Sequence, residues 1–470
     1  MKMGTFRLNQ LCFCVVAFAS GLASAREYHL TTDGAGNRDG RSWENASPKT
    51  KLTPLLADGL EAGDTVLIGS GVYSWRPEGS NTLLVIGCSG VKENPITIKG
   101  VDTGEGLPMI QGKWSERNAR YHAHSATAIN LDHGASHLRF SNLKITGFMH
   151  GFHIAGGGND VTIEGIEIRK CREGIRIEGL RDSEVRDCRL VGYTKRGIRF
   201  SQNCEDLTIS HVTADANGGE PDWPTESFPF GFSIESDQGN RRIRFERCVA
   251  RNNLHQGKPD DYWNGDGFVA ESLASEISYF GCEAYDNMDG GFDDKSLAPV
   301  FVNCVAVRNK RSFRCWNVRG DEDHPARLNN CLAVNSYRRG GSGGGTGLWM
   351  CGVVDIEKCT FHNGESCAVD IDQNGWAARL TARNCIFSSD RLTKSTELVK
   401  QESGTQCQTE GVVMWIEKVS GEDPQYVAPN DAWMGTPRTA YDSRRYEGAK
   451  GYGAPSRDFD YGRIRSEIMQ

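Results

Sequence analysis

Three phrases in the middle of the chain carry residues whose types and spacing suit chemistry. They read WNGDGFVAE at 263–271, DNMDGGFDDK at 286–295 and NKRSFRCW at 309–316. Asp266, Asp289 and Asp293 stand in similar Gly-rich contexts in the first two phrases. Carboxylates that converge repel one another unless a cation compensates them, and hard oxygen ligands favour Ca²⁺ over zinc or copper. One such Asp is explained by a turn, whereas three on neighbouring repeats predict a calcium site.

These phrases belong to a repeat that runs through most of the chain. Each copy holds a small residue, an apolar residue and a short alternating run. The copies read GFHIA at 151, GIRIE at 174, GIRFS at 197, GFSIE at 231, GFVAE at 267, GFDDK at 291, SFRCW at 312 and GLWMC at 347. Short strands at such intervals, with no apolar stripe of helical period between them, predict a parallel β-helix.

Two further series of residues favour the same fold. Cysteines begin recurring phrases such as CVARNN and CEAYDN, at Cys248, Cys282, Cys304, Cys331, Cys359 and Cys385. We interpret them as small buried residues stacked coil on coil, in preference to disulfides or a metal site. Asparagine recurs at the turns, at Asn252, Asn287, Asn309, Asn335 and Asn363. Asparagine tolerates left-handed backbone and can hydrogen-bond to its copies on the coils above and below.

Alternation along each strand predicts which side chains face outward. One outward column comprises His153, Arg176, Arg199, Ser233, Val269, Asp293, Arg314 and Trp349. A second comprises Glu178, Ser201, Glu235, Glu271, Lys295 and Trp316. Among the inward neighbours, Asp294 alone is unsuited to a core, so it is either a buried polar residue with a partner or the site of a strand bend. Coils of a parallel sheet lie about 4.8 Å apart, so one ligand can contact side chains from several repeats.

The two ends of the chain differ from the repeat. Residues 1–25 combine Lys2 and Arg7 with a short apolar run and the small-residue pattern Ala23-Ser24-Ala25, which predicts a cleaved signal peptide. The expected product is secreted or periplasmic. We predict a β-helix over 26–390 and a Pro-, Gly- and charge-rich cap or tail over 391–470. No later segment has the roughly 20 apolar residues of a membrane helix, so no membrane association is expected.

The charge balance limits the partners. The formal net charge of −7 makes general nucleic-acid binding an unfavourable prediction. An acidic polymer would need a local basic surface, which Arg176 and Arg199 can supply by pairing with carboxylates of the ligand. Each could equally belong to a solvated face. Trp316 and Trp349 could support sugar rings or pack beneath a loop. We expect a monomer that binds an acidic polysaccharide.

At this point the phrases can be compared with known families. NGDGF, then DGGFD, then a basic residue after Phe on the following coil resemble the family 9 polysaccharide lyases. The segments GDTVLIGSGVYSW and NPITIKG are similar to the same superfamily. The resemblance spans roughly residues 30–390. It implies a right-handed parallel β-helix that cleaves an acidic polysaccharide such as pectate by Ca²⁺-assisted β-elimination. It also implies that Asp266, Asp289 and Asp293 are calcium ligands.

Two positions depart from the family's pattern. The fourth ligand, expected directly after Asp289, is Gly290 in this chain. Its candidate replacements are Asp294 and the pair at 260–261. The family's catalytic lysine aligns with Arg314, and an arginine is almost always protonated because its pKa exceeds about 12. Other β-helix lyases are nevertheless thought to use an arginine base, so the resemblance implies Arg314 as the base. Lys295, two residues beyond Asp293 on the same face, is the second candidate.

Three other functions fit parts of the pattern. A β-helix glycoside hydrolase needs two carboxylates, which Asp289 and Asp293 could supply, but it leaves the basic residues unexplained. A uronan C5-epimerase shares the proton abstraction and differs in the step that follows. A non-catalytic β-helix that binds carbohydrate would keep the repeat and have no reason to gather Asp and Arg on adjacent coils.

Overall fold

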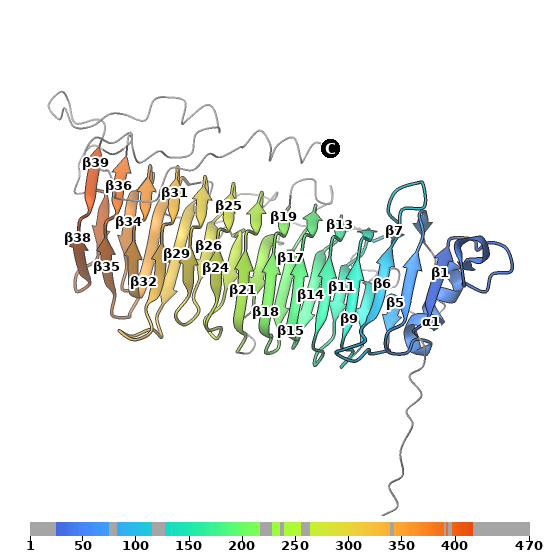
Figure 1. Ribbon diagram of the computed structural model, residues 1–470. Coiled ribbons are helices and arrows are strands. Elements are labelled where there is room, and N and C mark those ends of the chain that lie inside the picture. Colours follow the sequence, from blue (N-terminus) through green and yellow to red (C-terminus); the bar gives the residue numbers. More distant parts are fainter. Residues whose placement is uncertain are drawn as a thin grey trace, which may run out of the picture.

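The computed structural model shows a long stack of coils with three strand-lined faces, a right-handed parallel β-helix as the sequence predicts (Figure 1). All of the pairings between the strands are parallel. The structure describes residues 25–74, 82–114, 127–132, 134–216, 228–235, 239–254, 264–338, 343–389, 392 and 397–416.

We name the three faces sheets A, B and C. Sheet A contains β1 (Glu27–Thr31), β2 (Ser47–Pro48), β3 (Thr65–Ile68), β6 (Ile96–Gly100), β9 (Leu138–Ser141), β12 (Val161–Glu164), β15 (Arg181–Arg186), β18 (Glu205–Ser210), β21 (Arg241–Glu246), β24 (Ser278–Phe280), β27 (Val300–Val302), β30 (Ala326–Asn329), the second half of β32 (Thr346–Glu357), β35 (Arg379–Arg383) and β38 (Gln406–Glu410). Sheet B contains β4 (Val72–Tyr73), β7 (Met109–Gln111), β10 (Lys144–Thr146), β13 (Glu167–Arg169), β16 (Arg189–Val191), β19 (Thr213–Asp215), β22 (Val249–Arg251), β25 (Glu283–Tyr285), β28 (Val305–Val307), β31 (Leu332–Val334), β33 (Thr360–His362), β36 (Ile386–Ser389) and β39 (Val413–Ile416). Sheet C contains β5 (Thr82–Ile86), β8 (Thr127–Leu131), β11 (His150–Ile154), β14 (Glu173–Glu178), β17 (Arg196–Ser201), β20 (Phe230–Ile234), β23 (Phe268–Ala270), β26 (Gly290–Asp294), β29 (Arg311–Asn317), the first half of β32, β34 (Cys367–Ile371) and β37 (Val399–Gln401).

The register of sheet C is the one that the repeat predicts. His153 pairs with Arg176 and Arg176 with Arg199, and the column continues through Ser233 and Val269. It then passes to Asp293, Arg314 and Trp349 on successive coils. Their inward neighbours are buried, Asp294 included. A slip of one residue would turn every side chain of a strand to the other face, so the apolar positions alone determine this register.

The interior is a set of stacks in which like residues lie over like residues. Phe232, Phe268, Phe292 and Phe313 stack with ring centroids 4.8, 4.7 and 5.0 Å apart. The six cysteines of the recurring phrases have no exposed surface, and all the cysteines that the structure describes are free. Burial also raises the pKa of the Cys171 thiol to about 12, which makes it unreactive at neutral pH. The interpretation of the cysteines as buried packing residues is confirmed.

Asparagine has two roles at the turns. Asn252, Asn335 and Asn363 adopt left-handed backbone, with φ of 56°, 55° and 57°, and Nδ2 of Asn363 also donates to Oδ1 of Asn335 at 3.1 Å. Asn287 and Asn309 instead form a buried amide ladder, in which Nδ2 of Asn287 donates to Oδ1 of Asn309 at 2.9 Å. Asn253, next to the predicted Asn252, extends this ladder by donating to Oδ1 of Asn287 at 2.8 Å. The ladder pairs amide groups that would otherwise be buried at some cost.

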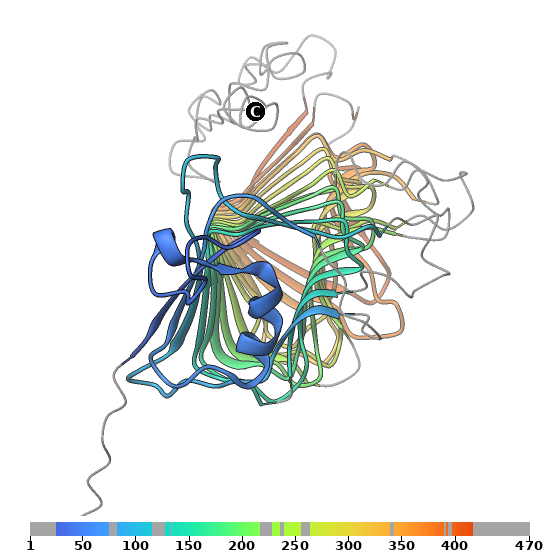
Figure 2. The ribbon, with the colours of Figure 1, turned by 90° about the vertical axis from the view of Figure 1, so that its right-hand side faces the viewer.

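The ends of the solenoid differ in one respect from the predicted boundaries. At the N-terminal end, two 3₁₀ turns (Trp43–Asn45 and Lys49–Lys51) and α1 (Leu52–Asp58) lie at the opening of the first coils (Figure 2). At the other end, β38 pairs with β35 and β39 with β36, so coils continue to Ile416, beyond the predicted limit of 390. The predicted signal peptide (1–25) lies almost entirely, and the tail from 417 entirely, outside the described residues. Within the described part, no helix is long and apolar enough to cross a membrane.

Candidate functional site

The predicted aspartates meet cations on the outer face of sheet C, over β23, β26 and β29. Asp293 on β26 lies beside Arg314 on β29, and Oδ2 of Asp293 accepts hydrogen bonds from Nη1 of Arg314 at 3.0 Å and Nζ of Lys295 at 3.1 Å. Nζ of Lys295 also contacts Oε1 of Glu271 at 3.1 Å. The two basic residues predicted as alternative bases therefore share one carboxylate. We name Asp266, Asp289, Asp293, Lys295, Lys310, Arg311 and Arg314 the ionic cluster.

Asp289 has its own cationic partners within the ionic cluster. Nη1 of Arg311 donates to both of its carboxylate oxygens at 3.1 Å. Nζ of Lys310 lies 3.7 Å from Oδ1 of Asp289. Burial lowers the pKa of Lys310 below its usual range despite the neighbouring carboxylate. Arg311 is a site residue that the sequence reasoning missed. Alternation could not have found it, since Arg311 begins the strand three residues before Arg314 and a period of two would turn it inward.

Asp266 is connected to the cluster through Gly290. Its Oδ1 accepts a hydrogen bond from the backbone N–H of Gly290. A Cβ at position 290 would lie 2.8 Å from that same oxygen, so glycine leaves the carboxylate its place. Burial, with the charges of Asp293 and Asp289, raises the pKa of Asp266 well above its usual range.

Asp293, Lys295 and Arg314 stabilise one another's charged forms. Burial favours the neutral form of Asp293, but Arg314 and Lys295 outweigh it and lower the pKa of Asp293. Burial acts against the charge of Lys295 too, and Asp293 and Glu271 outweigh it, so the pKa of Lys295 is raised. The pKa of Arg314 is raised by the same balance, with Asp293 as the main stabilising charge. These opposite charges are each buried only because their partners are present.

The two predicted tryptophans pack on the arginines. The guanidinium carbon of Arg314 lies 3.8 Å from the ring centroid of Trp316 and 4.7 Å from that of Trp349. Arg311 lies 3.9 Å from the ring of Trp349. Nε1 of Trp349 donates to Asp372 at 3.1 Å, which fixes that ring. The tryptophans thus orient the guanidinium groups through cation–π contacts, and their predicted contact with sugar stays a prediction.

Asp294 does not join the ionic cluster. It faces the interior, where Oδ2 accepts a hydrogen bond from Tyr279 at 2.9 Å. Oδ1 accepts from the backbone N–H of Ser296 at 2.8 Å and from its hydroxyl at 2.6 Å. Burial raises the pKa of Asp294 to about 6. Of the two interpretations offered for this residue, the buried polar group with partners is correct, and its prediction as a metal ligand is corrected.

Arg176 and Arg199 lie on the same face, several coils toward the N-terminus. Nη2 of Arg176 is 2.6 Å from Glu178, and Arg199 lies between Glu173 at 3.7 Å and Glu235 at 3.5 Å. Both arginines are therefore already paired with carboxylates of the protein. Glu178 and Glu235 belong to the second outward column, whereas Glu173 was not predicted. Their predicted pairing with substrate carboxylates stays a prediction.

The carboxylate oxygens of the ionic cluster differ from the ligands that a Ca²⁺ site requires. Calcium takes six to eight oxygen ligands. Here both oxygens of Asp289 and one oxygen each of Asp266 and Asp293 already accept hydrogen bonds from protein N–H groups. Oδ1 of Asp293, buried and without a hydrogen-bond partner among the described residues, is the one feature that favours a cation. In the part of the chain that the structure describes, no group of three His, Cys, Asp or Glu side chains could hold a metal ion. Residues 260–261 lie outside that part.

The ionic cluster therefore does not fit a calcium site as it stands. The reason is electrostatic. Lys295, Lys310, Arg311 and Arg314 surround the carboxylates and already supply the compensating positive charge. A divalent cation would have to displace them. Calcium stays a prediction of the sequence analysis.

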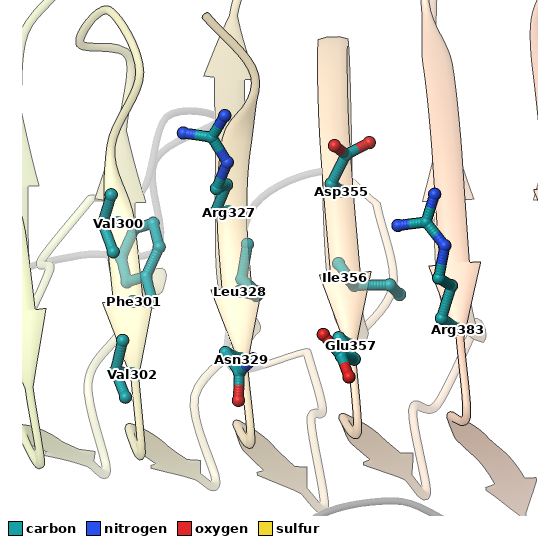
Figure 3. Close-up of a pocket in the computed structure, with 10 residues that line it drawn as sticks. All are labelled: Val300, Phe301, Val302, Arg327, Leu328, Asn329, Asp355, Ile356, Glu357 and Arg383. Carbon is teal, nitrogen blue, oxygen red and sulfur yellow. The ribbon is translucent and has the colours of Figure 1, made fainter.

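A cavity of about 540 Å³ lies elsewhere, on sheet A between β27, β30, β32 and β35 (Figure 3). Its lining includes Arg327, Asp355, Glu357 and Arg383. None of these residues belongs to the ionic cluster on sheet C. A depression between rows of side chains on a flat sheet follows from the strand spacing alone, so the chemistry and not the volume selects the candidate site.

Comparisons with known proteins agree with the fold. The family described as right handed beta helix region matches residues 111–258. No curated protein matches the sequence. The pectate lyase Pel9A has a similar structure at 14% sequence identity, with a TM-score of 0.50 over 69% of this chain and 80% of that one. A lacto-N-biosidase from Eubacterium ramulus is similar at 13% identity, with a TM-score of 0.52 over 83% of this chain and 68% of that one. The fold is a pectate-lyase-like right-handed β-helix, and this architecture occurs in proteins of more than one activity.

Proposed function

We propose that this chain is an enzyme that cleaves a uronic-acid-containing polysaccharide by β-elimination at the outer face of sheet C. The observation that carries the proposal is the pair of cations, Lys295 and Arg314, that meet at the carboxylate of Asp293. Both are partly accessible, whereas Asp293 beneath them is buried. Such a site offers both groups that β-elimination on a uronate requires, a potential base for the C5 proton and a fixed cation for the carboxylate.

The chemistry assigns a different task to each cation. The C5 proton of a uronic acid is weakly acidic because it lies alpha to the carboxylate. A cation at that carboxylate stabilises the charge that develops when a base removes the proton. The C5–H electrons then form the C4–C5 double bond, the C4–O bond breaks, and the leaving oxygen takes up a proton from solvent. The products are a chain with an unsaturated uronate at its new non-reducing end and a chain with a new reducing end.

Lys295 suits the base better than Arg314. An amine can lose its proton within the accessible pH range, whereas a guanidinium does so only with great difficulty. Arg314 is also held between two tryptophan rings and Asp293, which suits a group that orients a carboxylate. We therefore place Lys295 as the general base and Arg314 as the carboxylate anchor, the reverse of the order expected from the sequence.

A hydrolase is the second candidate, and one observation favours it. The pKa of Asp266 is raised and that of Asp293 is lowered, and two carboxyl groups with divergent pKa values can act as acid and base on a glycosidic bond. The hydrolase leaves the two cations on Asp293 without a task. Beta-elimination uses them and is the function we propose.

The test is incubation with a panel of acidic and neutral polysaccharides, monitored by ultraviolet absorbance and by reducing-end assay. Beta-elimination predicts that both signals rise together on at least one uronate polymer, because each cleavage makes one unsaturated uronate. Reducing ends without absorbance would replace the proposal by the hydrolase. No cleavage of any polymer in the panel would contradict both cleaving enzymes and leave the epimerase or a binding protein.

A further inference from the structure

We infer that Arg314, with Arg311 beside it, takes the place of a divalent metal ion at the substrate carboxylate, so that the reaction needs no calcium. The inference rests on the proposed function and specifies its electrophile. The family resemblance predicts calcium, and the donor set of the ionic cluster is what disagrees with it.

The first support is the balance of charge around the aspartates. Asp289 is bound by Arg311 and approached by Lys310, and Asp293 is bound by Lys295 and Arg314. Asp289 and Asp293 thus each already have two protein cations within 3.7 Å. A Ca²⁺ ion placed among them would be repelled by four positive charges unless several side chains moved away.

The second support is the fixed position of the two guanidinium groups. The ring of Trp349 contacts Arg311 and Arg314, and the ring of Trp316 contacts Arg314 from another side. The centroids of the two rings are 4.8 Å apart. Such packing reduces the side-chain entropy that an arginine would lose on binding a ligand. A metal ion provides the same advantage, a positive charge at a fixed point.

The third support is the unused hydrogen-bonding capacity of Arg314. A guanidinium has five N–H donors, and Arg314 gives one to Asp293 through Nη1. Its Nε–H is buried and has no hydrogen-bond partner among the described residues. A carboxylate is the acceptor that a planar guanidinium binds best, often through two parallel hydrogen bonds. The remaining Nη donors, on a side chain that is 16% exposed, are thus matched to a uronate.

The fourth support is the glycine at position 290. A side chain at this position would press on Oδ1 of Asp266 at 2.8 Å from its Cβ. Gly290 pairs with Arg311 on the next coil, so the position without a fourth carboxylate lies beside an arginine.

Calcium titration of the metal-stripped full-length protein tests the inference without relying on activity. We expect no heat of binding and no shift of the melting temperature with millimolar CaCl₂. Saturable calcium binding abolished by replacing Asp289 and Asp293 with asparagine would overturn the inference. In parallel, the rate on a cleaved polyuronate should change by less than about twofold when a chelator replaces calcium. A rate that requires calcium would overturn the inference and leave the proposed β-elimination intact. If no polymer is cleaved, the proposed function fails, and the titration still decides the metal question.

Arg314 variants test the positive half of the inference. Arg314→Gln should raise KM for the polyuronate by on the order of tenfold or more, since a charged hydrogen bond is lost. Arg314→Lys should restore part of the lost affinity, with a KM between those of the wild type and Arg314→Gln. The matched control is Arg244→Gln on sheet A, where an arginine likewise stacks on an aromatic ring, Phe280, beside a carboxylate, Glu246. An unchanged KM in Arg314→Gln, with the control also unchanged, would contradict the assignment.

Discussion

The outer faces of sheets A and C both consist of parallel strands that carry ion pairs, but they differ in how far those ion pairs are buried. On sheet A, Arg242 binds Asp206 and Arg186 binds Glu164 in pairs whose side chains are all more than a third exposed. On sheet C, Arg314 and Asp293 retain only 16% and 5% of their side-chain surface. Exposed pairs contribute about 0–1 kcal/mol each, so those of sheet A are explained as a solvated face.

The pairs of sheet C need another explanation. Burial of charges carries a desolvation cost that their mutual attraction offsets only with good geometry. The chain nevertheless gathers charged groups on three successive coils and shields them with tryptophans. Perturbed groups of this kind concentrate at functional sites. The comparison therefore teaches that burial of charge, and not its abundance, distinguishes the candidate site from the rest of the surface.

Removal of the proposed base should have the largest effect. Lys295→Met is expected to lower the lyase rate by about 10²–10⁴-fold, the range for loss of a general base. Initial rates from ultraviolet absorbance measure it, with circular dichroism as a check of folding. Lys358→Met is the matched control, because Lys358 is an exposed lysine beside Glu357 of sheet A. Equal rates in Lys295→Met and wild type would remove Lys295 from the mechanism.

The shared carboxylate should matter for stability on sheet C only. Asp293→Asn leaves Lys295 and Arg314 buried without their main counter-charge, which should reduce the free energy of unfolding by about 3–5 kcal/mol. Asp206→Asn, on sheet A, should cost about 1 kcal/mol or less. Urea denaturation of both variants measures the difference. Similar losses in the two variants would show that the contrast between the sheets has no energetic content.

The pH profile should reflect the raised pKa of Lys295. A base is active in its unprotonated form, and a raised pKa makes that form scarce at neutral pH, so the rate should increase as pH rises. At pH values below the pKa, raising the pH by one unit increases the fraction of unprotonated amine about tenfold. We therefore expect the rate to rise by up to about tenfold per pH unit between pH 7 and 9. Initial rates across buffers of constant ionic strength test this. A rate that is flat or falls with pH over this range is incompatible with Lys295 as base.

The smallest effect is expected on sheet A. Arg242→Ala removes the partner of the exposed Asp206, whereas the less exposed Glu205 keeps Arg241 as a second partner. We expect a loss of at most about 1 kcal/mol in the free energy of unfolding and no change in lyase rate. The same denaturation and absorbance assays measure both. A change in lyase rate would mean that sheet A participates in function and would direct attention to its cavity.

The fold could be predicted from the sequence because each coil of a solenoid repeats the same short pattern of residues. The outward column from His153 to Trp349 followed from alternation alone, and the buried cysteines followed from their recurrence. The partners of the site residues did not follow. Whether Asp293 binds a metal ion or Arg314 depends on distances of a few ångströms between coils, which no repeat encodes. Asp294 shows the same limit, since its partner Tyr279 belongs to another sheet.

The most direct measurement of the central claim is cleavage of a uronate polymer in water enriched in heavy oxygen, followed by mass spectrometry of the products. Beta-elimination breaks the C4–O bond without adding water, so the account predicts products with unsaturated ends and no heavy oxygen. Hydrolysis adds one oxygen from water to each new reducing end. Products that carry the heavy isotope in proportion to cleavage would contradict the assignment of Lys295 and Arg314 to β-elimination.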